Sequence, residues 1–342
     1  MSIYISGINC ISPIENFSKE MAVPEKQILQ NEFTYFSCKE PVYKEIINPM
    51  QLRRMSRVIK MGLASALLCL KDAGKEIPDA IITATGLGCV EDSDKFLTSL
   101  IENEEKMLNP TPFIQSTHNT IGSQIALQLK CHGYNSTYAG RGASFEMALM
   151  DSLLLLSDKE VKNILVGTYD ELTPNLIIIF NRLGFFRKNN SKHIPGEGSM
   201  FMFLSAEKGP NDYACLKDVS VFYEESSYQE QISTLLKRND LLLSDLDAVF
   251  LGTVRANDPE SEYEKIISSL TETSAIACFK HLSGDYFTTS SFATWLAVNC
   301  LKNQIIPDIS IIRKGTSSNL KNLIIINHTT GNQYSAILLA KC

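Results

Sequence analysis

The sequence predicts an α/β layered fold, in which strands and helices alternate along the chain. Short apolar runs bounded by glycine or polar turn residues predict the strands, and longer segments with apolar residues at helical spacing predict the helices. The chain has 342 residues, of which 44% are hydrophobic and 20% charged, with a mean hydropathy of -0.03. These values are typical of a globular protein with a substantial core.

Several apolar runs have the length and the flanking residues of strands. The predicted strands are Ile3–Ile11, Ala80–Thr85, Asn163–Gly167, Ser199–Ser205, Ala248–Leu251, Asn322–Asn327 and Tyr334–Ala340. A long helix is predicted over Arg54–Ala73, where Val58, Met61 and Leu68 recur at helical spacing and Gly74 can end the helix.

Two further helices are predicted over 119–130 and 144–156. Both are apolar on more than one face, so we expect both to be buried. The segment Glu207–Leu216 contains glycine, proline and asparagine, which are frequent in linkers. We therefore place the boundary of two halves there, with the N-terminal half at 1–208 and the C-terminal half at 209–342.

The net charge of -6 argues against a nucleic-acid partner, because binding phosphates requires clustered lysine and arginine. One local basic cluster, Arg53, Arg54, Arg57 and Lys60, could meet an acidic carrier protein, but an ordinary solvated helix face explains it better.

The nine cysteines are odd in number and form no Cys-x-x-Cys pair, which is typical of buried thiols in a reducing compartment. The sequence begins without a signal peptide, and no apolar run reaches the ~18 residues of a membrane span. We expect a cytoplasmic protein.

General motifs for cofactors and metals are missing from the sequence. Gly86-Leu87-Gly88 lacks the third glycine of a dinucleotide fingerprint, and the five histidines have no metal-ligand spacing. We expect no cofactor and no bound metal.

The string YAGRGASFEMAL, at Tyr138–Leu149, resembles the strand-to-helix elbow that presents the nucleophilic cysteine in β-ketoacyl synthases of the thiolase fold. Other strings resemble that family in its own order along most of the chain. They are RRMSRVIKMGLASALLCLKDAG, NTIGSQIALQL, GTYDELTP, PGEGSMFMFLSAE, FLGTVRANDPESE, FKHLSGDYFTTSSFATW and NHTTGNQYSAILL. The resemblance implies a thiolase-like fold: two pseudo-duplicated halves, each with a mixed five-stranded sheet, in five layers (α-β-α-β-α).

The catalytic residues that the resemblance implies are missing at three positions. Gly142 stands where the family has the acyl-accepting cysteine, and Leu251 and Asp285 stand where it has two histidines. Only Lys280 is retained, and we expect it to form an ion pair with Asp285 or Glu197. Without a thiolate and two imidazole donors the family's condensation cannot proceed by its usual route, so no catalytic residue is predicted.

Other side chains of the elbow remain candidates. Arg141 could plug an acyl tunnel or pair with Glu146, and Ser144 could act as a nucleophile with His281 as its base. Phe145 follows Ser144 on the predicted helix.

His118-Asn119, together with Arg141-Gly142 and KHLSGD, resembles the ketosynthase-like proteins of aryl polyene and flexirubin-type pigment clusters. That group includes chain-length factors, which are inactive synthase homologues paired with an active one. The resemblance therefore implies a heterodimer with an active ketosynthase, which takes its substrates from an acyl carrier protein.

Two alternatives remain open at this point. One is an acyltransferase or thioesterase of altered chemistry that uses Ser144, His281 or Cys89. The other is a homodimeric scaffold that binds acyl carrier proteins.

Overall fold

The computed structural model describes residues 2–29, 33–185, 187–188, 191–223, 228–253, 261–270, 273–317, 319–329 and 333–342. Parts of the strings FLGTVRANDPESE and NHTTGNQYSAILL, at 254–260 and 330–332, lie outside the described residues.

Five strands of the N-terminal part form one array, in the spatial order β1-β9-β6-β4-β5. Their bounds are β1 Ile3–Ile11, β4 Ala80–Ala84, β5 Tyr134–Tyr138, β6 Asn163–Asp170 and β9 Gly198–Ser205. The pairs β1–β9 and β9–β6 are antiparallel, whereas β6–β4 and β4–β5 are parallel. Parallel pairs require crossovers, and helices of this part supply them.

The C-terminal part repeats this topology, in the order β10-β15-β14-β11-β12. Its strands are β10 Ala214–Tyr223, β11 Ala248–Leu251, β12 Ala275–Cys278, β14 Asn322–His328 and β15 Gln333–Ala340. The first two pairs are again antiparallel and the last two parallel. The predicted duplication is therefore visible in strand order and direction.

An aspartate before the second strand has the same role in each part. Asp79 accepts hydrogen bonds from the Lys162 and Asn163 amides at 2.9 and 3.1 Å, where β6 begins. Asp247 accepts from the Lys321 and Asn322 amides at 2.7 and 2.9 Å, where β14 begins. Each carboxylate thereby satisfies backbone donors at a strand end.

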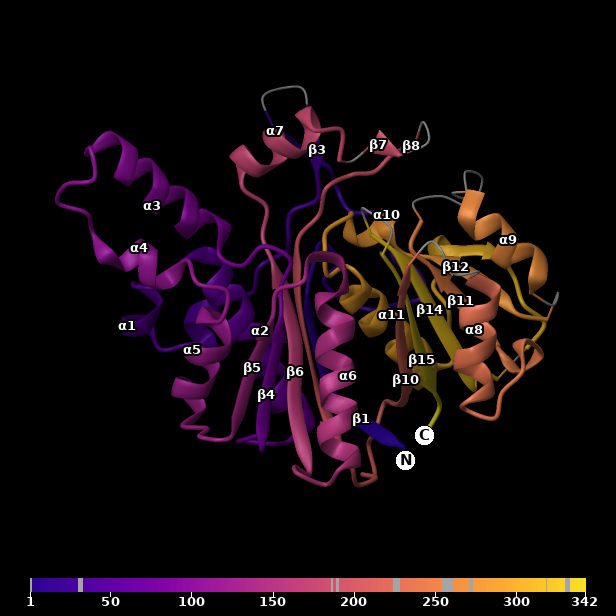
Figure 1. The fold of residues 1–342 in the computed structure, drawn as a ribbon. Coiled ribbons are helices and arrows are strands. Elements are labelled where there is room, and N and C mark those ends of the chain that lie inside the picture. Colours follow the sequence, from indigo (N-terminus) through magenta and orange to yellow (C-terminus); the bar gives the residue numbers. More distant parts are fainter. Residues whose placement is uncertain are drawn as a thin grey trace.

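Helices cover both faces of both arrays, which confirms the predicted five layers (Figure 1). The helices of the N-terminal part are α1 Pro49–Leu52, α2 Arg57–Ala73, α3 Val90–Glu102, α4 Pro110–Gln115, α5 Thr120–Leu129, α6 Ser144–Ser157 and α7 Pro174–Arg182. Those of the C-terminal part are α8 Tyr228–Lys237, α9 Ser261–Ser269, α10 Lys280–Ser283 and α11 Ser290–Asn303. Helices α6 and α11 touch strands of both arrays and form the middle layer.

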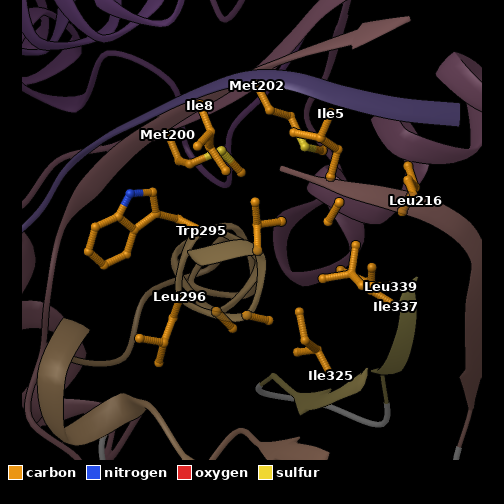
Figure 2. Close-up of a cluster of buried hydrophobic side chains, with 14 of the residues drawn as sticks. Ile5, Ile8, Met200, Met202, Leu216, Trp295, Leu296, Ile325, Ile337 and Leu339 are labelled. Atoms are coloured by element: carbon orange, nitrogen blue, oxygen red, sulfur yellow. The ribbon is translucent and has the colours of Figure 1, made fainter. Parts of the chain in front are cut away.

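The central core surrounds α11 (Figure 2). Trp295 and Leu296 of this helix lie among side chains of both parts, such as Ile5 and Met200 on one side and Leu339 on the other. Separate apolar clusters lie under α2 and α5 and under α8 and α9. Burial of apolar surface on both faces of each array holds the layers together.

The resemblance implied a separate sheet in each half, but the two arrays join at one edge. Strands β1 and β10 pair through Ile3, Tyr4 and Ile5, which gives one continuous sheet that also includes β13, Ile311–Arg313. Two short hairpins lie outside it, β2 Gln27–Leu29 with β3 Phe33–Tyr35 and β7 Arg187–Lys188 with β8 Ser191–Lys192. The predicted boundary at 208–209 falls between β9 and β10 and stays a prediction.

Two helix predictions need correction. The first long helix begins at Arg57 rather than Arg54, since Ser56 is its N-cap; it ends at Gly74, whose φ is +62°. Helices α5 and α6 are buried on one face only, because Leu127 of α5 and Leu154 of α6 are 72% and 62% exposed. Their apolar outer faces are therefore free in the single chain.

Candidate functional site

The elbow is formed as predicted, between β5 and α6. A turn at Arg141–Ala143 connects them, and Arg141 has a φ of +57°, which is unfavourable for a side chain with a Cβ. Ser144 stabilises the turn: its hydroxyl accepts from the Gly140 amide at 2.8 Å and donates to the Arg141 carbonyl at 2.7 Å. The Ser144 hydroxyl is thus part of the turn's own hydrogen bonding.

Thr329 fills the space in front of Gly142. A Cβ placed on Gly142 would lie 1.9 Å from Thr329 Oγ1 and 2.5 Å from Thr329 Cβ. Thr329 is itself buried and follows β14, so it reaches the elbow from the C-terminal part. Residue 142 therefore has no room for a side chain in this arrangement.

Lys280 forms its ion pair with Asp285, one of the two partners predicted for it. Lys280 Nζ lies 2.9 Å from Asp285 Oδ1 and donates to the His328 carbonyl at 2.9 Å. The other oxygen of Asp285 lies 2.8 Å from His193 Nδ1. The Lys280 and His193 side chains are each 1% exposed and the Asp285 side chain 11%, so the charges of Lys280 and Asp285 compensate each other in a buried site.

Glu197, the other predicted partner of Lys280, pairs with Arg57 instead. The Arg57 guanidinium holds both of its carboxylate oxygens, at 2.6 and 2.7 Å. The Cys38 and Leu172 amides also donate to Glu197. Arg57 thus has a structural ion pair, also with Glu40, and is not part of a free basic cluster.

Leu251 ends β11 and is fully buried. It belongs to the apolar cluster under α8 and α9, on the outer side of the C-terminal array. A hydrocarbon in that cluster adds to the core and offers no hydrogen-bond donor for a thioester.

Arg141 and Glu146 do not pair with each other. Arg141 is exposed, and Glu146 is fully buried in the middle layer, where the Ser335 hydroxyl donates to it at 2.7 Å. Burial is the chief cause of a raised pKa of the Glu146 carboxyl. Because the Arg141 side chain faces solvent, the structure gives no support to a plug in a buried tunnel.

His281 lies beside Cys278 and not beside Ser144. Cys278 Sγ and His281 Nδ1 are 3.5 Å apart. Burial raises the pKa of Cys278 to about 12 and lowers that of His281 to about 4, so both are neutral near pH 7. By strand alternation Cys278 shares the face of Ile276, which packs in the outer cluster away from the elbow.

The remaining predicted residues have ordinary environments. Cys89 is fully buried, and burial with nearby Glu171 raises its pKa well above the usual range. Phe145 is fully buried in the central core. His118 is exposed, with its ring against Gly88, and its carbonyl accepts from the Tyr169 hydroxyl.

A buried aspartate that the sequence did not single out connects the two parts of the chain beside the site. Asp170, at the end of β6, accepts from Thr85 Oγ1 and the Gly86 amide of one part, at 2.9 and 2.8 Å. It also accepts from the Thr288 amide and hydroxyl of the other part, at 3.0 and 2.7 Å. The sequence does contain a signal for Asp170, because an aspartate follows a predicted apolar strand in the string GTYDELTP.

Strand β5 is the last strand of its array, and apolar hollows flank it. One cavity of about 520 Å³ begins at Gly140 of the elbow and is lined by Met147, Met150 and Leu154 of α6 and by Tyr223 of β10. Another of about 520 Å³ lies on the other side, along α5 and β5. A free edge strand with apolar residues on both sides is suited to pairing with another chain.

No cluster of metal-binding side chains is found among the described residues. In the same part of the chain, no helix is both long and apolar enough to cross a membrane.

Residues 28–181 match the family described as the N-terminal domain of β-ketoacyl synthases. No protein of the curated set matches the sequence.

Solved structures match along the whole chain at low identity. One is described as the ishigamide ketosynthase/chain length factor, with 13% identity, a TM-score of 0.81 and coverage of 100% of this chain and 99% of that one. A ketosynthase (ApeO) in complex with its chain length factor (ApeC) from Xenorhabdus doucetiae has 15% identity, a TM-score of 0.76 and coverage of 100% and 98%. A β-ketoacyl synthase from Burkholderia phymatum STM815 has 13% identity, a TM-score of 0.76 and coverage of 100% and 99%.

These similarities agree with the duplicated strand order, the five layers and the elbow. Residues 28–181 thus carry a β-ketoacyl synthase N-terminal domain match, and the chain as a whole has the thiolase-like fold of the similar structures.

Proposed function

We propose that this protein is a chain-length-factor-like subunit, catalytically silent in condensation, that pairs with an active ketosynthase. The observation that carries this proposal is Thr329 in the space in front of Gly142. A missing thiol alone could be replaced by a neighbouring nucleophile, but a filled elbow leaves no place for an acyl group to attach there.

The surroundings of the elbow support the same conclusion. The positions that correspond to the family's two histidines are the buried Leu251 and the ion-paired Asp285. A carboxylate held by Lys280 and facing His193 offers hydrogen-bond acceptors, whereas an enolate oxygen needs donors.

The open edge at β5 supports a partner subunit. Strand β5 ends at the elbow, and the exposed apolar residues Leu127, Met150 and Leu154 lie on the helices at its two sides. A second chain that continues the sheet at β5 would cover these residues and place its own elbow near Gly142. Two of the similar structures are described as a ketosynthase with a chain length factor.

The proposed role is to shape the space in which a partner's growing acyl chain is held, in type II polyketide or fatty-acid-like biosynthesis of the aryl polyene or flexirubin type. The acyl carrier protein would deliver its substrates to the heterodimer. One similar structure is described as a type II acyl-carrier protein in complex with its ketosynthase, at 14% identity and a TM-score of 0.75.

Two other functions remain as alternatives. An acyltransferase or thioesterase would need an activated nucleophile, but the Ser144 hydroxyl is engaged in the elbow turn and His281 lies beside Cys278. A homodimeric scaffold for acyl carrier proteins would use the same β5 edge with a second copy of this chain.

The test is co-expression with a tagged ketosynthase that has an intact Cys-His-His set, taken from an aryl polyene or type II polyketide system. We expect a 1:1 complex, condensation activity only with the complex, and no acyl adduct on this chain after incubation with an acyl-carrier thioester. A covalent adduct on Ser144 or Cys89 would favour altered chemistry, and a homodimer that persists beside the synthase would favour the scaffold.

A pair of variants tests the filled elbow itself. Gly142→Cys introduces a thiol against Thr329, whereas Gly142→Cys with Thr329→Gly introduces it with space around it. We expect iodoacetamide to label residue 142 only in the double variant. Equal labelling in both variants would show that Thr329 does not occupy the site.

A further inference from the structure

Two cysteines from distant parts of the sequence meet at the seam between the two arrays. Cys215 lies on β10, and its Sγ is 3.0 Å from Sγ of Cys342. This distance is shorter than an ordinary contact between two sulfur atoms, and both cysteines are free thiols. The odd number of cysteines gave no sign of such a pair.

Strand register explains the meeting. Cys215 pairs with Tyr4 of β1 on one side and with Ala340 of β15 on the other. Strand β15 ends at Ala340, directly opposite Cys215, and Cys342 follows two residues later. The pairing of β10 with β15 therefore brings the end of the chain beside Cys215, and the Lys341 amide holds that end by donating to the Lys321 carbonyl at 2.7 Å.

The surroundings favour reaction at this pair. Cys342 is exposed, whereas Cys215 is buried. A small oxidant can therefore reach the pair from the side of Cys342. The hydrogen bond between the two sulfur atoms is the chief cause of a lowered pKa of Cys215, and the same contact raises the pKa of Cys342, so Cys215 is the thiol of the pair that ionises first. A pair with one favoured thiolate reacts faster with disulfides than two ordinary thiols do.

We propose that Cys215 and Cys342 form a reversible disulfide under oxidising conditions, which clips the end of β15 to β10 at the seam of the two arrays. The oxidant is a low-molecular-weight disulfide such as oxidised glutathione. A thiolate of the pair attacks one sulfur of glutathione disulfide and releases one glutathione. The second cysteine then loses its proton, attacks the mixed disulfide and releases the second glutathione, so that two protein thiols lose two electrons and one glutathione disulfide gains them.

The test uses the full chain in glutathione buffers from fully reduced to strongly oxidised. Free thiols are blocked with N-ethylmaleimide, and the unreduced digest is analysed by mass spectrometry. We expect a linked peptide pair containing Cys215 and Cys342, about 2 Da lighter than the two thiol peptides together. We also expect oxidation to raise the melting temperature by on the order of 5 °C, with reversal by dithiothreitol.

Cys342→Ser should remove both the link and the rise in melting temperature, and Cys131→Ser is the matched control that should keep both. Cys131 is partly buried and donates to the Pro78 carbonyl, away from the seam. Three outcomes would overturn the proposal: glutathione on Cys342 with Cys215 still free, a disulfide between two chains, or both thiols still blocked by maleimide in the most oxidising buffer. The mapping on the unchanged chain decides the question even where a variant folds poorly.

Discussion

The two arrays share one strand order but differ at their outer edges. In the C-terminal array the last strand, β12, is covered by β13, whose Ile311 and Arg313 lie opposite Ala277 and Ile276. The matching strand of the N-terminal array, β5, has no such cover among the described residues. An uncovered edge invites aggregation unless another chain occupies it. The contrast is that the duplicated scaffold closes one edge by itself and leaves the edge at the elbow open, which is where the proposed function places a partner.

The largest effect should follow from charge on the open edge. Met150→Asp with Leu154→Asp would place two carboxylates on the exposed face of α6, where a partner has to bury them. We expect the affinity for the ketosynthase to fall at least about 100-fold, measured by titration of the purified subunits.

Leu242→Asp is the matched control, because Leu242 is 65% exposed and lies in the C-terminal part, away from β5. The affinity of the Leu242→Asp variant for the ketosynthase should be unchanged. If both variants bind equally well, the open edge is not the interface and the contrast with β12 loses its functional meaning.

The paired aspartates compare the two arrays directly. Asp247→Ala removes the acceptor of two amides and of the Ser317 hydroxyl, and we expect a loss of about 3 kcal/mol in the free energy of unfolding. Asp79→Ala removes the acceptor of two amides at a more exposed position, and we expect about half that loss.

Denaturant unfolding with Glu76→Ala as an exposed control measures both losses. A larger loss for Asp79→Ala would reverse the expected ranking. It would show that exposure does not decide how much each aspartate contributes to the free energy of unfolding.

A rise in pH should change the contributions of two buried groups to the free energy of unfolding in opposite directions, one group in each part of the chain. Burial, as the chief cause, raises the pKa of Glu171 in the N-terminal part to about 7. Between its unfolded value near 4.5 and 7 the folded chain binds more protons there, so this group lowers stability as the pH rises. Burial lowers the pKa of His281 to about 4, so that group lowers stability as the pH falls from about 6.5 to 4.

Glu171→Gln should therefore raise the free energy of unfolding by about 2 kcal/mol at pH 8 and by little at pH 4. Glutamine keeps an oxygen for the Glu91 amide, which donates to Glu171 at 3.0 Å. Thermal unfolding across this pH range provides the measurement, and a gain that is the same at both pH values would contradict the raised pKa.

The smallest effect concerns the turns before the two central helices. Before α11 a glycine, Gly284, has the positive φ of +75°, whereas before α6 the residue with positive φ is Arg141. Arg141→Gly should raise stability by up to about 1 kcal/mol. Arg182→Gly, at the exposed last residue of α7, should lower it by less than about 1 kcal/mol, and a loss in both variants would mean that the Arg141 side chain has a role of its own.

The sequence allowed prediction of much of the fold, because β1, β6, β9, β14 and β15 are long apolar runs. It gave a weaker signal for β10 and β12. Strand β10 begins inside the segment that composition marked as a linker, and it pairs through its backbone with β1 and β15, which periodicity does not report.

At the site, the resemblance predicts that Gly142, Leu251 and Asp285 are altered positions, which stays a prediction, and it could not show which residues surround them. Thr329 meets Gly142 only because β14 and the elbow converge, and His193 meets Asp285 only across two loops. Such contacts depend on tertiary packing between residues far apart in the chain.

The threonine against the elbow also has an evolutionary consequence. A codon change that places cysteine at residue 142 alone would create a clash with Thr329, and a change to glycine at residue 329 alone would leave an empty space. Each single step costs stability, so under the proposed function the two positions would have to change together before a thiol could stand at the elbow.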